Sequence, residues 1–284
     1  MKVQKGNAEV TEYMRKDKKT KKKENLRLMA FLQFIFVFGM LAGSLIMLAL
    51  SPLFEIHDIY VRGNSHYSEE DIIDASGIIL GTNGFKLIGG STEDILNLRN
   101  SDAENTIKKE LSYIKDVVVK FALTDKIIIT VKERKPFAVV PFYGTSILVD
   151  DEAYVLETFE GGTPKSLPVI KGLKFDSFEI GQALELESMD NFFYAVNLIN
   201  EIVKSDSKSD FKLFSKIDYF DVHDIDNICI LYDSRIVVNL GNLEKLSYRI
   251  DFAKEILKKN IREDEKGQLD FTLSENPSFI PSEY

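Results

Sequence analysis

The sequence predicts an α+β protein with one N-terminal transmembrane helix, a compact β-α-α-β-β domain and a second, mixed β domain. Three observations support this fold class. An uncharged stretch of 23 residues lies near the N-terminus. Residues 54–135 switch between the period of two typical of strands and the period of 3.6 typical of helices. Residues 136–273 then consist mostly of short strand-like runs, with two amphipathic helices and a closing edge strand.

The uncharged stretch is residues 28–50, which are rich in Phe, Leu, Ile and Met. As a helix it would be roughly 34 Å long, which is enough to cross a hydrocarbon core of about 30 Å. Ten Lys and Arg against four acidic residues give the tail 1–27 a net charge of +6, so the remaining chain carries −15. The positive-inside rule therefore predicts a cytoplasmic tail and extracytoplasmic domains from residue 54 onward.

A cleavable signal peptide is the competing interpretation of the apolar stretch. It requires a shorter apolar core and a small-residue cleavage site, which Leu50-Ser51-Pro52-Leu53 does not provide. We therefore expect an uncleaved single-pass anchor at the cell membrane. The basic tail is attributed to topology and to attraction by anionic lipid. No nucleic-acid partner is expected, because the chain as a whole has a net charge of −9.

Gly39 and Gly43 form a GxxxG spacing within the predicted membrane helix. This spacing permits close packing of two helices. Glycine is common in membrane helices for other reasons as well, and coincidence is the stronger of the two interpretations.

The first predicted domain begins with a strand over 54–61, where apolar and polar side chains alternate. Two capping-box patterns, at Ser68–Asp71 and at Ser91–Asp94, predict the starts of helices. An apolar stripe of Ile107, Leu111 and Ile114 predicts a further helix over 103–114. Two apolar, β-branched runs then predict a pair of strands, at 117–121 and 126–133.

This order and three of its motifs resemble the POTRA domain of the FtsQ/DivIB bacterial cell-division family. The motifs are Val61-Arg62-Gly63-Asn64, Ser68-Glu69-Glu70-Asp71-Ile72 and the exit Glu133-Arg134-Lys135-Pro136 after the last strand. The resemblance implies a POTRA domain at 54–135.

The second predicted domain, residues 136–273, is built mainly of short strands. We expect them at 147–149, 153–156, 167–172, 217–220, 228–231, 236–241 and 268–273. Two helices carry apolar stripes, at Met189, Phe193, Val196, Ile199 and Val203 in the first and at Leu243, Leu246, Ile250, Ala253 and Leu257 in the second. Residues 274–284 are expected to be a flexible tail.

This domain is similar to the second domain of the same family, above all in Leu167-Pro168-Val169-Ile170-Lys171-Gly172. The resemblance implies a divisome scaffold at the division septum that helps to regulate septal peptidoglycan synthesis. It implies that the POTRA domain helps recruitment and that the second domain binds FtsB/DivIC-like and FtsL-like coiled-coil proteins. Other divisome membrane proteins are further expected partners.

The strand at 268–273 is our candidate for the partner-binding edge. An edge strand leaves N–H and C=O groups that a partner strand can pair with. The candidate residues are Gln268, Leu269, Asp270, Phe271, Thr272 and Leu273. The competing interpretation is that the Pro-bearing tail covers this edge.

The sequence shows no pattern typical of catalysis. One cysteine, Cys229, excludes an intrachain disulfide, and the three histidines are scattered along the chain. The acidic run at 218–226 lacks the spacing of a calcium loop. We therefore predict no enzyme activity, cofactor or metal site. The alternative functions are a POTRA-type chaperone or transport component and a membrane-tethered cell-wall hydrolase.

Overall fold

The computed structural model describes residues 27–160, 167–273 and 276–282. The predicted basic tail, apart from Arg27, lies outside the described residues. Packing divides the chain into two units: the first holds the chain up to Tyr60 with Ile78–Asn100 and Lys120–Ile128, and the second holds the rest. Each unit is described by itself.

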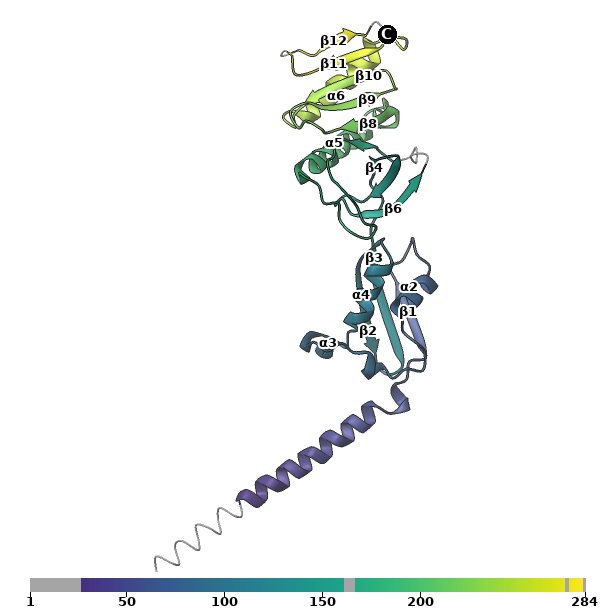
Figure 1. The fold of residues 1–284 in the computed structure, drawn as a ribbon, viewed down its shortest axis with the longest axis vertical. Coiled ribbons are helices and arrows are strands. Elements are labelled where there is room, and N and C mark those ends of the chain that lie inside the picture. Colours follow the sequence, from purple (N-terminus) through teal and green to yellow (C-terminus); the bar gives the residue numbers. More distant parts are fainter. Residues whose placement is uncertain (1–26, 161–166, 274–275, 283–284) are drawn as a thin grey trace, which may run out of the picture. The chain divides into compact units, whose positions relative to one another are not determined.

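The predicted membrane segment is one helix, Arg27–Ala49, which is long and apolar enough to cross a membrane (Figure 1). A short 3₁₀ turn, η1 (Pro52–Phe54), follows it. Gly39 and Gly43 both lie in this helix, and a Cβ added at either position would meet nothing within 4 Å. Neither interpretation of this glycine pair, close helix packing or coincidence, is decided by this observation.

The following elements build a small three-stranded sheet with helices. They are β1 (Asp58–Arg62), α2 (Glu69–Ser76), η2 (Gly84–Leu87), α3 (Thr92–Asn97), α4 (Ser101–Glu110), β2 (Ile114–Ala122) and β3 (Lys126–Glu133), with strand order β1-β3-β2. The mixed α+β fold class is confirmed: α2, α3 and α4 correspond to the three expected helical stretches, although the predicted order β-α-α-β-β counts only two helices.

Both predicted capping boxes are present. The Ser68 side chain accepts a hydrogen bond from the Asp71 N–H, and Ser91 does the same for Asp94. The predicted helix over 103–114 is wrong at its end, because α4 stops at Glu110. Ile114, expected on the helical stripe, instead starts β2 and is buried there.

The second unit continues into two further sheets. β4 (Ala138–Phe142), β5 (Thr145–Val149) and β6 (Val155–Glu160) form an antiparallel three-stranded sheet. A six-stranded sheet has the order β12-β11-β10-β9-β8-β7 (Figure 1). Its strands are β7 (Ile170–Lys171), β8 (Ile217–Asp221), β9 (Ile228–Tyr232), β10 (Ile236–Gly241), β11 (Gly267–Asp270) and β12 (Ser278–Pro281).

Two helices, α5 (Met189–Ser207) and α6 (Leu246–Lys259), pack on the sheet strands in one apolar core. The buried face of α5 differs from the apolar stripe read from the sequence. Phe193 and Val203 of that stripe are exposed, whereas Phe192 and Ile202 are fully buried. The helix carries apolar residues on more than one face, and the sheet selects which face is buried.

The prediction that 268–273 forms the sheet edge is wrong, because β11 has a neighbour on each side. It pairs in parallel with β10 and antiparallel with β12. Residues 271–273 lie beyond the end of β11. The 274–284 segment, expected to be a flexible tail, supplies β12, so the competing interpretation of a covered edge is the one observed.

Candidate functional site

The outer edge of the six-stranded sheet is formed by β12 in the part of the chain that the structure describes. The opposite end is closed by a bridge: Val139 of β4 pairs with Val169 next to β7 and donates its N–H to the Pro168 carbonyl at 2.8 Å. β12 is therefore the candidate for pairing with a partner strand.

Hydrogen bonds between antiparallel strands alternate along the ladder. The Ser282 N–H donates to the Lys266 carbonyl at 2.9 Å. Two residues earlier, Ile280 lies opposite Gln268 in the same phase. The even-numbered residues of β12 therefore direct their backbone groups toward β11.

The odd-numbered residues of β12 direct their backbone groups outward. These residues are Phe279 and Pro281. Because proline has no N–H, the outward side offers one donor, the Phe279 N–H, and two carbonyl acceptors. A proline that faces outward is a common way to restrict what can add to a sheet edge.

The strand pairing depends on a close approach at Gly267. A Cβ placed there would lie 2.3 Å from the Ile280 carbonyl oxygen and 3.0 Å from the Phe279 ring. Any side chain at this position would push β12 away from β11. The glycine thus positions the outer strand.

A buried carboxylate secures the end of β11. Asp270 Oδ1 accepts hydrogen bonds from the Thr272 N–H and hydroxyl, each at 2.7 Å. Its Oδ2 accepts from the Gln268 amide at 2.9 Å and the Asn239 amide at 3.1 Å. Burial raises the pKa of Asp270, but these hydrogen bonds outweigh burial and hold the pKa below its usual value.

An ion pair joins the two helices behind the sheet. Lys254 of α6 donates to Asp206 of α5 at 2.8 Å, and both side chains are more than nine-tenths buried. Asp206 also accepts the N–H groups of Leu213 and Phe214, at 3.0 and 2.9 Å. Burial raises the pKa of Asp206, yet these donors and Lys254 together lower it.

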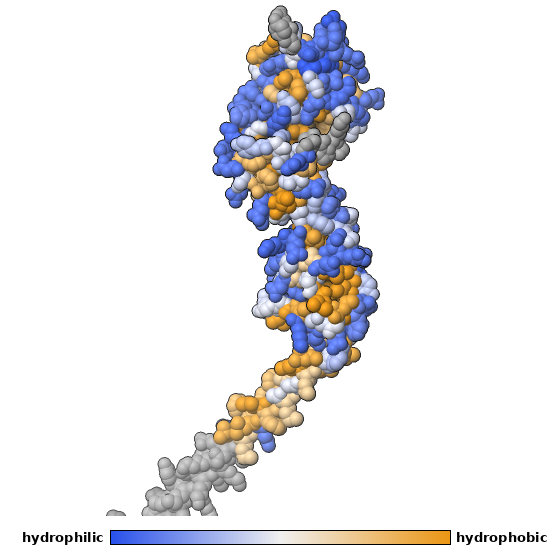
Figure 2. All heavy atoms as spheres, turned by 45° about the vertical axis from the view of Figure 1, so that its right-hand side comes forward, coloured by the Kyte–Doolittle hydropathy of each residue, from blue (hydrophilic) through white to orange (hydrophobic). Residues whose placement is uncertain are grey.

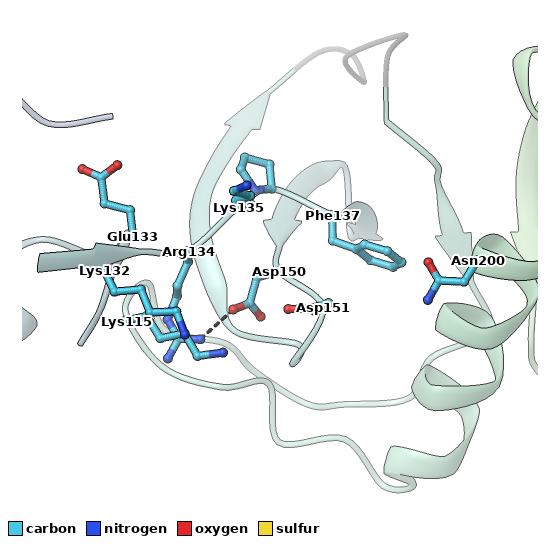
Figure 3. A pocket seen from close by; sticks show the side chains of 10 residues that line it. Lys115, Lys132, Glu133, Arg134, Lys135, Phe137, Asp150, Asp151 and Asn200 are labelled. Carbon is cyan, nitrogen blue, oxygen red and sulfur yellow. Dashed lines mark hydrogen bonds and ion pairs between the residues drawn. The ribbon is translucent and has the colours of Figure 1, made fainter. Parts of the chain in front are cut away.

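A second feature of this unit is a hollow of about 480 Å³ next to the end of β3 (Figure 3). Its lining residues are Lys115, Lys132, Glu133, Arg134, Lys135, Pro136, Phe137, Asp150, Asp151 and Asn200. The polar side chains of this lining are those of Lys, Arg, Asp, Glu and Asn, without a His, Cys, Ser or Thr.

Arg134 is the centre of this hollow. It donates to Asp150 at 2.6 Å and to Glu152 at 3.1 Å, and it stacks on the Tyr154 ring at 3.6 Å from the centroid. In Figure 3, Arg134 and Asp150 point toward one another from the chain after β3 and the β5–β6 turn. The positive charge of Arg134 is balanced by the Asp150 and Glu152 carboxylates. These ion pairs fix the path of the chain after β3.

Cys229 and two carboxylates of the acidic run at 218–226 form hydrogen bonds with residues near them in the structure. The Cys229 thiol donates to the Asn227 carbonyl at 3.3 Å, and burial followed by nearby carboxylates raises its pKa to about 11. A thiol with such a pKa is almost fully protonated at neutral pH and is a weak nucleophile. Asp218 accepts hydrogen bonds from Ser234, and Asp224 accepts from Asp226 and Asn227.

Comparisons with known proteins agree with this architecture. The family model described as "POTRA domain, FtsQ-type" matches residues 54–134. The Cell division protein DivIB of Clostridium botulinum (strain Hall) is 26% identical over 249 residues, which cover 86% of this chain and 89% of the relative. That of Clostridium tetani is 25% identical over 228 residues, covering 80% and 79%. The chain is therefore similar to FtsQ/DivIB proteins over most of its length, and its residues 54–134 match an FtsQ-type POTRA domain. The Cell division protein DivIB of Listeria monocytogenes is 27% identical over 197 residues, covering 68% of this chain and 66% of the relative.

These relatives indicate that the chain is a protein of cell division, and its apolar N-terminal helix is compatible with a single-pass membrane anchor. The edge residue Phe279 was not among the residues predicted from the sequence. The signal for it was present, because Ser278-Phe279-Ile280-Pro281 is a short run that ends in a proline, as edge strands do.

Proposed function

We propose that this chain is a divisome scaffold that works by binding rather than by catalysis. Its extracytoplasmic domains bind FtsB/DivIC-like and FtsL-like coiled-coil proteins and help to regulate septal peptidoglycan synthesis. The POTRA domain helps to bring it to the septum, where other divisome membrane proteins join it. Relatives named as division proteins over most of the chain support this proposal.

The proposed topology has the N-terminus in the cytoplasm and residues from 54 onward outside. Ten basic residues in 1–27, against an acidic remainder, support this orientation. Anionic lipid is the proposed partner of the basic tail.

The route of partner binding is β-augmentation at the outer side of β12. The single observation that carries it is the outward Phe279 N–H with the Phe279 and Pro281 carbonyls, which no other described strand pairs with. A partner segment in extended conformation can use these groups. Because the Phe279 N–H is the one outward donor of β12, we expect the partner strand to pair over only a few residues and in one register.

Phe279→Pro tests this route in the full chain. The substitution removes the outward N–H but leaves the even-numbered residues that bind β11, so the sheet stays folded. Phe279→Ala is the matched control, because it removes the ring and keeps the N–H. We expect co-purification of the coiled-coil partners to be lost with Pro and retained with Ala. Equal co-purification by both variants would exclude the β12 edge.

Live imaging of an N-terminal fluorescent fusion tests the scaffold function itself. We expect a mid-cell band that appears during division. An even membrane signal throughout the cell cycle would contradict the proposal and would direct attention to wall-directed activity instead.

A further inference from the structure

The first unit exposes two pairs of consecutive large aliphatic residues. Ile79 and Leu80 are 72% and 58% exposed, and Ile95 and Leu96 are 58% and 78% exposed. Single exposed apolar residues are ordinary on soluble surfaces. Two pairs of consecutive exposed aliphatic residues, both in Ile78–Asn100 of the first unit, indicate a surface that binds another apolar surface.

The segment that carries the first pair is hydrogen-bonded to the end of the membrane helix. The Asn83 side-chain amide donates to the Ala49 carbonyl at 3.0 Å and to the Ser51 carbonyl at 3.1 Å. Asn83 is itself buried. It therefore satisfies the Ala49 carbonyl, one of those that the helix end leaves without an intrahelical donor, and it fixes this loop at the end of the helix.

The backbone repeats this connection. The Ile56 N–H donates to Thr82 at 2.9 Å, and the Gly81 N–H donates back to Ile56 at 2.8 Å. Leu80 is three residues from Asn83, and three residues of chain span at most about 11 Å. The Leu80 backbone therefore lies within about 11 Å, or about two helical turns, of Asn83, whose side chain is bonded to the end of the apolar helix.

Aromatic rings connect the second pair to the same place. Phe54, just after the helix, contacts the Phe85 ring at 5.0 Å between centroids, and Phe85 contacts Phe121 at 5.3 Å. The Phe121 N–H donates to the Leu98 carbonyl at 2.8 Å, at the end of α3. The helix exit, the 79–83 turn and α3 are thus held in one packed unit.

We propose that Ile79-Leu80 and Ile95-Leu96 dock into the bilayer surface next to the exit of the membrane helix. Lipid is the proposed binding partner, because the two pairs belong to the same packed unit as the helix proposed to cross the membrane. Their exposed side chains are apolar, as are those of that helix. Figure 2 shows apolar surface both on the helix and on the domain that follows it. Leu53, 60% exposed between helix and domain, extends this surface.

Aliphatic side chains suit this role. They gain free energy by leaving water without requiring a fixed geometry, so a fluid lipid surface can cover them. Docking at two points besides the helix would restrict rotation of the first domain about the anchor.

The absence of Trp from the sequence makes a direct test available. Leu80→Trp in the full chain introduces a single tryptophan, which can be excited selectively, at the proposed lipid contact. Tyr143→Trp is the matched control, because Tyr143 is 95% exposed and lies in the β4–β5 turn of the second unit. Both variants are reconstituted into liposomes of phosphatidylcholine and phosphatidylglycerol, with and without brominated acyl chains.

We expect the Leu80→Trp emission to be blue-shifted and to lose intensity in brominated lipid, while the Tyr143→Trp emission does neither. Emission at position 80 that matches the water-exposed control would overturn the proposal, and it would then point to a protein as the covering surface. Leu96→Trp provides an independent reading if the Leu80 variant does not fold. If a folded Leu96→Trp variant emits at the wavelength of water-exposed tryptophan and is not quenched by brominated lipid, the proposed role of Ile95 and Leu96 is wrong.

Discussion

The first unit and the C-terminal sheet expose different kinds of chemical group. The first unit exposes aliphatic side chains in adjacent pairs, whereas the C-terminal sheet exposes the backbone groups of one short strand, β12. Apolar side chains bind any apolar surface without direction. Backbone donors and acceptors bind only a strand in register. The two proposals together assign unselective contact with lipid to the first unit and selective contact with a protein to the C-terminal sheet.

The largest effect is expected from Lys254→Met, which leaves the Asp206 carboxylate buried without its cation. Breaking a buried pair on one side costs about 3–5 kcal/mol. Hydrogen exchange measured by mass spectrometry should show faster exchange across β10 and β11 and unchanged exchange in the first unit. Lys204→Met is the control, because Lys204 is 59% exposed in its pair with Glu201, and exposed pairs contribute at most about 1 kcal/mol. Faster exchange in both units would show that the effect of the substitution is not confined to the second unit.

Gly267→Ala is expected to have the next largest effect. A methyl group 2.3 Å from the Ile280 carbonyl oxygen forces β12 outward, and such overpacking costs about 1–3 kcal/mol. Deuterium uptake should rise in 278–281 while α5 stays protected, and partner binding should weaken with it. Gly90→Ala provides the control, since nothing lies within 4 Å of a Cβ there. Normal uptake in β12 would show that the strand tolerates the displacement.

Acid should weaken the C-terminal sheet before the first unit. The pKa values of Asp206 and Asp270 are lowered in the folded state. Their stabilisation is therefore fully present above the unfolded value of about 4 and is lost as the pH falls through the folded value. Each unit of pKa difference corresponds to about 1.4 kcal/mol. Urea unfolding followed from pH 6 to pH 3 measures this, and Asp270→Asn should flatten the dependence.

The smallest effect on stability is expected from Leu96→Ser. Its side chain is 78% exposed, and exposed substitutions usually change stability by less than about 0.5 kcal/mol. The unfolding midpoint should stay unchanged in detergent. Ile107→Ser, at a fully buried position in α4, should lower it strongly. A large loss with Leu96→Ser would mean that this residue packs within the protein.

Local signals in the sequence predicted much of this fold correctly. The capping boxes at Ser68 and Ser91 act between residues three apart, so no other part of the chain is needed to form them. The membrane helix follows from composition and length alone. Most strands of the second domain were found as apolar runs between turns, whereas β4 was missed because Pro141 interrupts its pattern.

Packing against other elements decided what the sequence left open. The spacing of Ile107 and Ile114 is compatible with one continuous helix, but Ile114 is the first residue of strand β2 in the structure. In α5 the sheet buries Phe192 and leaves Phe193 exposed. Both residues are apolar, so hydropathy alone does not distinguish them.

The sequence by itself determined the anchor, the fold class and the existence of a strand near 268, because these depend on hydropathy and on local periodicity. Only the tertiary structure decided that β11 is internal and that β12 is the edge. Backbone hydrogen bonds between strands are almost independent of side-chain identity, so the residues of a strand can permit a neighbour but do not specify which segment it is. It depends on which segment reaches that side, and here Gly267 leaves room for 278–281 to do so.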